Sequence, residues 1–141
     1  MNNFKFLKGF EVELFTGTFD KHVGVSNEIE EHFMNFVKEP DNRNVEYITP
    51  PYTDYEVLYK SLLSPRKDLR KWLKSRNLTI IPSSTLCFCH DSKFQRSDLS
   101  NDYHQFIESN YGISIATSSV HINMGINLSL IHISEPTRRD Q

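Results

Sequence analysis

Gly9-Phe10-Glu11-Val12-Glu13-Leu14-Phe15 alternates apolar and polar side chains, and the alternation extends over residues 5–16. A period of two residues is typical of a half-buried β-strand. The stretch therefore predicts a strand that turns Phe10, Val12 and Leu14 toward a core and turns its other side chains away from it. Later segments have to cover this apolar face, so the strand is the starting point for the fold.

Glu11 and Glu13 lie on the other face of this predicted strand. Their Cα atoms would be about 6.6 Å apart. Carboxylates at that spacing repel each other unless a positive charge lies near them. Mg²⁺ prefers oxygen ligands from a few carboxylates together with phosphate oxygens. The pair indicates either a metal and nucleotide site built on a sheet or, taken alone, two acids that face water.

The rest of the chain alternates predicted helices and strands. Capping-box patterns at Asn27 with Glu30 and at Thr53 with Glu56 predict two helix starts. Pro65 predicts a kink, or two helices that meet, within the longer helix. The alternating elements predict a mixed α+β domain. Helices are predicted over 28–36, from 53 onward and over 102–110, strands over 45–49, within 78–89 and over 113–126, and a loop over 37–43.

Composition narrows the class of protein. The chain has 141 residues, a net charge of -2 and a pI of about 6.3, which argues against a nucleic-acid or membrane-surface partner. No apolar run approaches the ~20 residues of a membrane-spanning helix. The N-terminus lacks the apolar stretch of a signal peptide, so we expect a cytoplasmic protein. Cys87 and Cys89 alternate along a predicted strand, and we expect them to be spectator thiols.

Residues 128–141 differ from the rest of the chain. The segment from Leu128 to Arg138 is similar to the in-frame translation of a transposon-derived sequencing adapter, and the last three residues would come from the adjoining index. Such segments have to be set aside before a fold is considered. We therefore expect residues 1–127 to be the N-terminal part of a longer domain, and residues 128–141 to be a non-native tail.

Several motifs occur in a fixed order along residues 5–127. They are Gly9-Phe10-Glu11-Val12-Glu13, then Glu39 followed seven residues later by Glu46 in Asn44-Val45-Glu46-Tyr47-Ile48-Thr49-Pro50, then Tyr111-Gly112, and finally His121-Ile122-Asn123. This ordered set resembles the glutamate–cysteine ligases, especially those of the cyanobacterial type. The first motif alone has little specificity, whereas the ordered set is specific.

The resemblance implies a catalytic domain like that of glutamine synthetase, with a mostly antiparallel curved sheet and helices on one face. It also implies a reaction in which L-glutamate and L-cysteine are joined at the expense of ATP, through an acyl phosphate. That reaction is the first step of glutathione biosynthesis. Mg²⁺ or Mn²⁺ would assist by neutralising phosphate oxygens and by holding them in position.

The resemblance assigns candidate roles to particular side chains. His121 would contact a metal or the nucleotide phosphate, Asn123 would line the same strand face, and Thr49 would line the glutamate pocket. Taken singly, each residue also has a structural explanation, such as an acid that faces water or a hydrogen-bonded histidine. The remaining histidines, His22, His32, His90 and His104, are expected to be surface or structural residues. The candidate metal ligands are Glu11, Glu13, Glu39, Glu46 and His121.

Two alternatives remain open at this point. The chain could belong to a sister ligase of the same fold that uses another amine, because the amine-binding residues cannot be assigned. It could also be a non-catalytic fragment, since phosphoryl transfer requires a complete set of preorganised groups. We expect no ligase activity from the 141-residue chain alone. The sequence does not define an oligomeric state.

Overall fold

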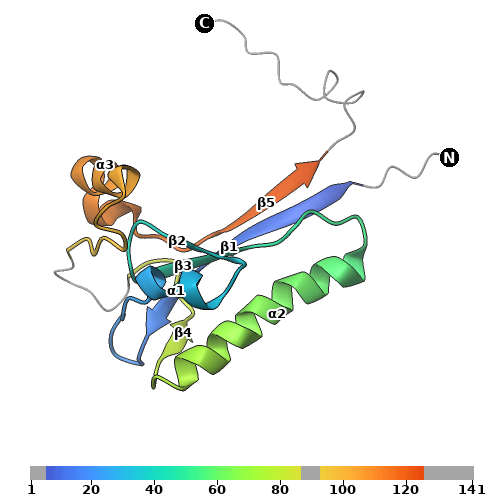
Figure 1. The fold of residues 1–141 in the computed structure, drawn as a ribbon, viewed down its shortest axis with the longest axis horizontal. Helices are drawn as coiled ribbons and strands as arrows, with labels where there is room; N and C mark the ends of the chain where they lie inside the picture. Colours follow the sequence, from blue (N-terminus) through green and yellow to red (C-terminus); the bar gives the residue numbers. More distant parts are fainter. Residues whose placement is uncertain (1–5, 87–92, 126–141) are drawn as a thin grey trace, which may run out of the picture.

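The computed structural model describes residues 6–86 and 93–125 (Figure 1). Cys87, Cys89 and the predicted tail over 128–141 lie outside the described residues. The strands are β1 (Leu7–Gly17), β2 (Phe36–Lys38), β3 (Asn44–Ile48), β4 (Thr79–Ile81) and β5 (Val120–Gly125). The helices are α1 (Ser26–His32), α2 (Tyr55–Lys74), α3 (Asp102–Asn110) and a 3₁₀ turn, η1 (Gly112–Ile115).

β1 is the centre of a five-stranded sheet in which every pair of strands is antiparallel. One edge of β1 pairs with β3, and β2 continues the sheet beyond β3. The other edge is shared, because β5 pairs with the first half of β1 and β4 pairs with its last residues. The predicted α+β domain with a mostly antiparallel sheet is therefore confirmed. The long strand β1 joins segments that are far apart in the sequence.

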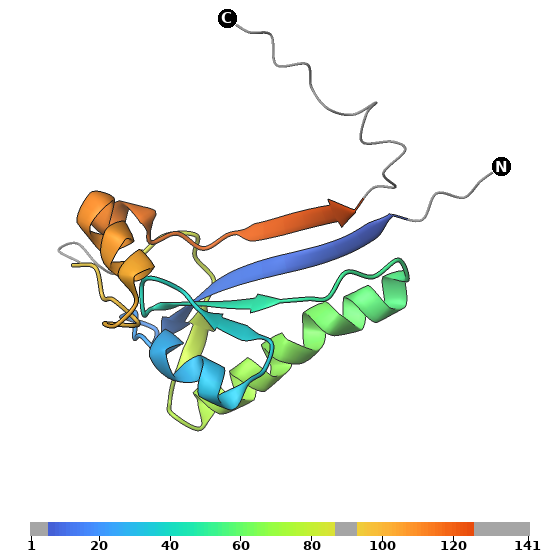
Figure 2. The same cartoon turned by 45° about the horizontal axis from the view of Figure 1, so that its top comes forward.

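α1 and α2 supply the hydrophobic cover for one face of the sheet. Figures 1 and 2 show α2 along this side, whereas α3 lies on the side away from α2. Val12 of β1 is buried, and Phe10 and Leu14 pack against the same core, as the alternation of the first strand predicts. The helices contribute Ile29, Leu69 and Leu73 to this core. Burial of such side chains stabilises the fold by about 1.5–3 kcal/mol for each one.

α2 departs from its predicted form in two respects. Its N-cap is Asp54, whose side chain accepts a hydrogen bond from the Val57 amide at 2.9 Å, and not Thr53. The helix also continues through Pro65, so of the two predicted alternatives, a kink or two helices that meet, the second is wrong. Pro65 is buried, and buried leucines on both sides of it, Leu58 and Leu69, hold the helix in place. The tertiary packing outweighs the backbone hydrogen bond that proline cannot donate.

Other boundaries also differ from the sequence prediction. α1 ends at His32 and has no side-chain cap, so the predicted cap at Asn27 is wrong. β2 lies in the region predicted as helix and loop. It contains Phe36, which pairs with Tyr47 of β3. The strand predicted over 113–126 begins only at Val120. The first part of the predicted stretch belongs to η1, which begins at Gly112 in a left-handed conformation, with φ of 55°.

None of the helices in the described ranges is both long enough and apolar enough to cross a membrane. α2 has the length, with 20 residues, but it carries many charged side chains along them.

Candidate metal centre

The face of the sheet opposite α2 gathers acidic side chains from neighbouring strands. Glu11 and Glu13 come from β1, and Glu46 lies directly across from Glu13 on β3. His121 of β5 lies across from Glu11. Residues that are opposite each other in an antiparallel pair share a face, so strand pairing brings these groups together. Glu39 follows β2 and reaches the same cluster. The structure thus brings together all five residues predicted from the sequence as ligands.

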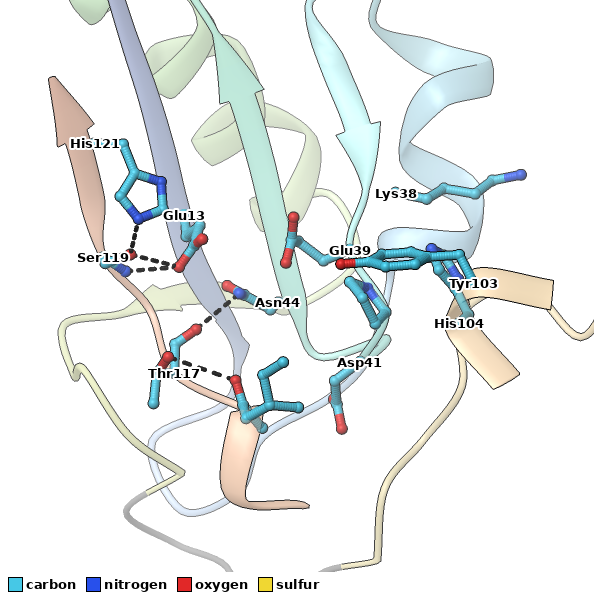
Figure 3. Close-up of a pocket in the computed structure, with 13 residues that line it drawn as sticks. Glu13, Lys38, Glu39, Asp41, Asn44, Tyr103, His104, Thr117, Ser119 and His121 are labelled. Carbon is cyan, nitrogen blue, oxygen red and sulfur yellow. Dashed lines mark hydrogen bonds between the residues drawn. The ribbon is translucent and has the colours of Figure 1, made fainter. Parts of the chain in front are cut away.

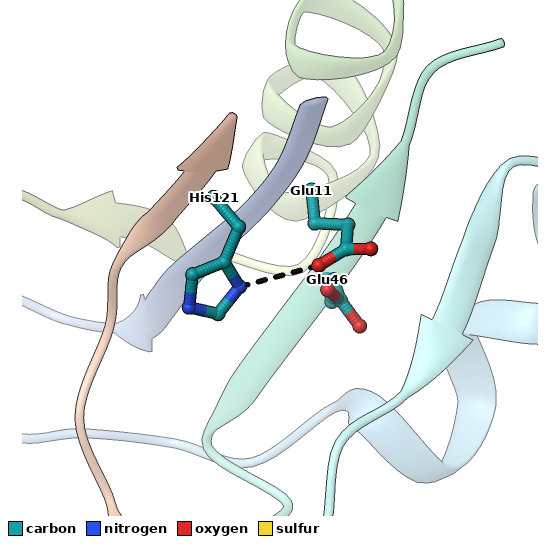
Figure 4. A group of neighbouring side chains, drawn as sticks. All are labelled: Glu11, Glu46 and His121. Atoms are coloured by element: carbon teal, nitrogen blue, oxygen red, sulfur yellow. Dashed lines mark ion pairs between the residues drawn. The ribbon is translucent and has the colours of Figure 1, made fainter. Parts of the chain in front are cut away.

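Glu46 is common to two groups of potential ligand atoms. In one group, atoms of Glu11, Glu46 and His121 all lie within 4.8 Å of one another, and in the other, atoms of Glu13, Glu39 and Glu46 do. Figure 4 shows the first group, with His121 Nδ1 at 3.3 Å from Glu11 Oε2. Carboxylate oxygens suit Mg²⁺ or Mn²⁺, and an imidazole nitrogen is a further donor to a divalent metal. Each group could hold one cation, and Glu46 is common to both groups.

The carboxylates of this cluster influence one another strongly. Burial, a hydrogen bond with Glu46 and repulsion from Glu46, Glu13 and Glu11 together raise the pKa of Glu39 from 4.5 to about 8. Burial, followed by repulsion from Glu13 and Glu11, also raises the pKa of Glu46. A pKa of about 8 favours the protonated form of Glu39 at neutral pH in the metal-free protein, and Glu39 can then share a proton with Glu46. A divalent cation would supply the positive charge that this proton provides only in part.

Basic side chains do little to neutralise the cluster. Lys38 lies next to Glu39 in the chain, yet its Nζ is 3.5 Å from Glu30 and 3.8 Å from Asp98. Figure 3 shows its ammonium group pointing away from Glu39. No other lysine or arginine is among the described residues that line the pocket at this site. The charge and chemistry of the donor set therefore fit a divalent cation.

A pocket of about 440 Å³ adjoins the second group of carboxylates (Figure 3). One wall is formed by Glu13 and Ser119, and the opposite wall by Tyr103 and His104 of α3. A pocket of this size can hold a small polar molecule beside the acids. The described lining residues are Glu13, Lys38, Glu39, Pro40, Asp41, Asn44, Tyr103, His104, Ile115, Ala116, Thr117, Ser119 and His121.

The two remaining predicted site residues have specific partners. Asn123 Nδ2 donates a hydrogen bond to Glu11 Oε1 at 3.1 Å, so Asn123 lies on the same strand face and orients that acid. Thr49 is buried, and its Oγ1 accepts a hydrogen bond from the Phe10 amide at 2.9 Å. Thr49 thus fastens the end of β3 to β1 and is not among the described residues that line the pocket.

Sequence reasoning did not identify the residues of the far wall of the pocket. His104 was expected to be structural, and it is buried, with Nδ1 at 3.2 Å from Ser97 Oγ; burial lowers its pKa. It nevertheless lines the pocket, next to the exposed Tyr103. Ser119 was also missed, although Ser119, His121 and Asn123 alternate at a period of two in the sequence. That alternation is the signal that could have included Ser119.

Comparisons with known proteins found one matching family and a similar solved structure. The family model described as glutamate-cysteine ligase family 2 matches residues 7–130. A crystal structure of a bifunctional glutathione synthetase from Pasteurella multocida is similar in fold, with a TM-score of 0.70 at 17% sequence identity. The similarity covers 96% of this chain but 19% of that one, so the chain spans about a fifth of the larger protein. No curated protein matches the sequence. The family match covers most of the chain, and the protein is therefore a member of glutamate-cysteine ligase family 2.

Proposed function

We propose that this chain supplies the divalent-cation region of an ATP-dependent glutamate–cysteine ligase. The observation that carries the proposal is the position of Glu46, which belongs to both groups of potential ligand atoms. Membership of the family supports the class of reaction. The matched structure is much longer than this chain, so groups that complete the site would come from other parts of such a protein.

In the proposed reaction, a γ-carboxylate oxygen of L-glutamate attacks the γ-phosphorus of ATP. The bond from that phosphorus to the bridging oxygen breaks, so ADP leaves and an acyl phosphate forms. The amine of L-cysteine then attacks the acyl carbon, loses a proton and displaces inorganic phosphate. Mg²⁺ or Mn²⁺ would neutralise phosphate oxygens and hold them in line for transfer.

The residues of this chain would act mainly by binding and orientation. Glu11, Glu46 and His121 would hold one cation, and Glu13 and Glu39 would join Glu46 around the other. Asn123 would keep Glu11 in position through its hydrogen bond to Oε1. The pocket beside Glu13 and Glu39 would receive a substrate, with α3 excluding water from one side. Lys38 is the only lysine or arginine among the described residues that line this pocket, so the cationic side chains that bind the phosphates would come from elsewhere.

The test uses a full-length member of the family that aligns with this chain, together with the chain itself. Phosphate release that requires ATP, glutamate and cysteine together is expected from the full-length protein and not from the 141-residue chain. Rates of phosphate release with other small amines in place of cysteine then identify the amine substrate. Phosphate release that does not depend on glutamate, or equal rates with every amine, would contradict the proposed ligation.

A further inference from the structure

We propose that Ser119 is a positioning residue of the metal centre, which holds the carboxylate of Glu13 and sets the tautomer of His121. The inference rests on the proposed function, because it takes these two residues to be metal ligands. Ser119 directly precedes β5 and stands between them on the acidic face of the sheet (Figure 3). It was not among the residues predicted from the sequence.

Ser119 binds one oxygen of Glu13 twice. Its amide donates to Glu13 Oε2 at 2.8 Å, and its hydroxyl donates to the same oxygen at 2.9 Å. Hydrogen bonds to an ionised carboxylate are stronger than those between neutral groups. Two of them on one oxygen fix the plane of the carboxylate, and the other oxygen is oriented as a consequence.

The local backbone makes this double contact possible. The Glu13 amide donates to the Ser119 carbonyl at 2.9 Å, as it does in a regular antiparallel ladder. In a regular ladder the Ser119 amide would donate to the Glu13 carbonyl in return. Here it donates to the Glu13 side chain instead. Ser118 compensates, since its hydroxyl donates to the Glu13 carbonyl at 2.7 Å. Ser118 therefore completes the backbone pairing, whereas Ser119 acts on the side chain.

The same hydroxyl also reaches His121. Ser119 Oγ lies 3.3 Å from His121 Nε2. A serine hydroxyl has a single hydrogen, and while Ser119 directs it to Glu13, the same oxygen can only accept from Nε2. In that arrangement the hydrogen of a neutral His121 ring is on Nε2, which leaves the lone pair on Nδ1.

Nδ1 of His121 faces the carboxylate of Glu11 at 3.3 Å. Two lone pairs at that distance repel each other unless a proton or a metal cation lies between them. The tautomer set by Ser119 thus presents Nδ1 to the group formed with Glu11 and Glu46. Partners that fix the tautomer of a ligand histidine typically change metal affinity 10–100-fold when they are removed.

The experiment compares Ser119→Ala, Ser119→Thr and the matched control Ser118→Ala in the complete chain without metal. ¹⁵N-edited spectra identify the His121 ring by its loss in a His121→Gln variant and report the tautomer of the neutral ring. We expect the Nε2–H form in the wild type, in Ser119→Thr and in Ser118→Ala. In Ser119→Ala we expect a shift toward the Nδ1–H form, which can donate to Glu11. Retention of the wild-type tautomer in Ser119→Ala would overturn the proposal.

Titration with Mn²⁺ provides a second measurement. The affinity should fall about tenfold or more in Ser119→Ala and stay close to the wild-type value in Ser119→Thr and Ser118→Ala. An equal fall in both alanine variants would mean general damage to β5 and would overturn the specific role of Ser119. If the wild type binds no Mn²⁺, the proposed metal function fails, while the tautomer measurement still decides whether Ser119 controls His121.

Discussion

At the scale of single residues, Glu46 is the acid on which the candidate centre depends most. It faces Glu13 across the β1–β3 pair and contributes to both groups of potential ligands. Its neighbours contribute to one group each. Loss of Glu46 would therefore affect both cation positions at once.

Glu46→Gln should weaken Mn²⁺ binding to the chain by at least about tenfold, since the amide retains the shape of the side chain but loses its charge. Isothermal titration measures the change. Glu31→Gln is the matched control, because Glu31 is an exposed acid on α1 outside both groups. Equal affinities for the wild type and Glu46→Gln would show that Glu46 is not a ligand.

The raised pKa of Glu39 leads to a prediction about how stability depends on pH. Its pKa is raised from 4.5 to about 8 in the fold, so its contribution to stability is complete below pH 4.5 and is lost as the pH rises through 8. The lowered pKa values of His22 and His104, whose ordinary value is 6.5, affect stability only on the acid side of pH 6.5. Between pH 7 and 9 the metal-free protein should therefore become less stable.

Urea unfolding of the metal-free protein at several pH values measures this loss. Glu39→Gln should flatten the decrease between pH 7 and 9, because the amide does not ionise. Glu31→Gln should retain the wild-type slope. Parallel curves for the wild type and Glu39→Gln would contradict the assignment of the raised pKa to Glu39.

At the scale of the elements, α2 depends on a cap that differs from the one predicted. Asp54 accepts a hydrogen bond from the Val57 amide, whereas Thr53 is exposed just outside the helix. Asp54→Ala should lower the free energy of unfolding by about 1 kcal/mol. Thr53→Ala should change it by less than about 0.5 kcal/mol. Urea unfolding distinguishes the two, and a larger loss in Thr53→Ala would show that threonine is the functional cap.

The strands show which elements a local pattern can predict. β1 was predicted because apolar and polar side chains largely alternate over residues 5–16, and such alternation is a property of the segment itself. β2 was missed because it has three residues and exists through its pairing with β3. The predicted strand over 113–126 was too long, since the alternation of Ile113 and Ile115 belongs to a 3₁₀ turn.

At the scale of the whole molecule, a buried ion pair joins distant parts of the chain. Arg43 Nη2 lies 2.7 Å from Asp41 Oδ2, and both side chains are at most 3% exposed. Asp41 also accepts from the Gln95 amide, and Arg43 donates to the Lys93 carbonyl. The pair thereby ties the β2–β3 connection to the segment that leads to α3 and the far wall of the pocket.

Asp41→Asn should destabilise the protein by about 3–5 kcal/mol, because it removes the negative charge of one partner of a buried ion pair. Glu28→Gln is the matched control, since the Glu28–Arg76 pair is partly exposed, at 42% and 36% of the side chains. Its loss should cost less than about 1 kcal/mol. Chemical unfolding measures both variants. Similar losses in the two would indicate that burial of the Asp41–Arg43 pair has no special effect.

The acidic face of the first strand could be predicted from local sequence, because alternation places Glu11 and Glu13 on one face and the geometry of a strand is constant. Glu39, Glu46 and His121 have no such local signal. They were singled out by the resemblance of the ordered motifs to a known family.

Only the folded chain determined which of these groups meet and which residues support them. Ser119 contacts Glu13 from 106 positions away, and His104 reaches the pocket because α3 packs beside it. No local pattern encodes such contacts, since strand pairing and helix packing arise from interactions between distant segments. The raised pKa of Glu39 has the same origin, because burial and the approach of three other carboxylates exist only after the strands have paired.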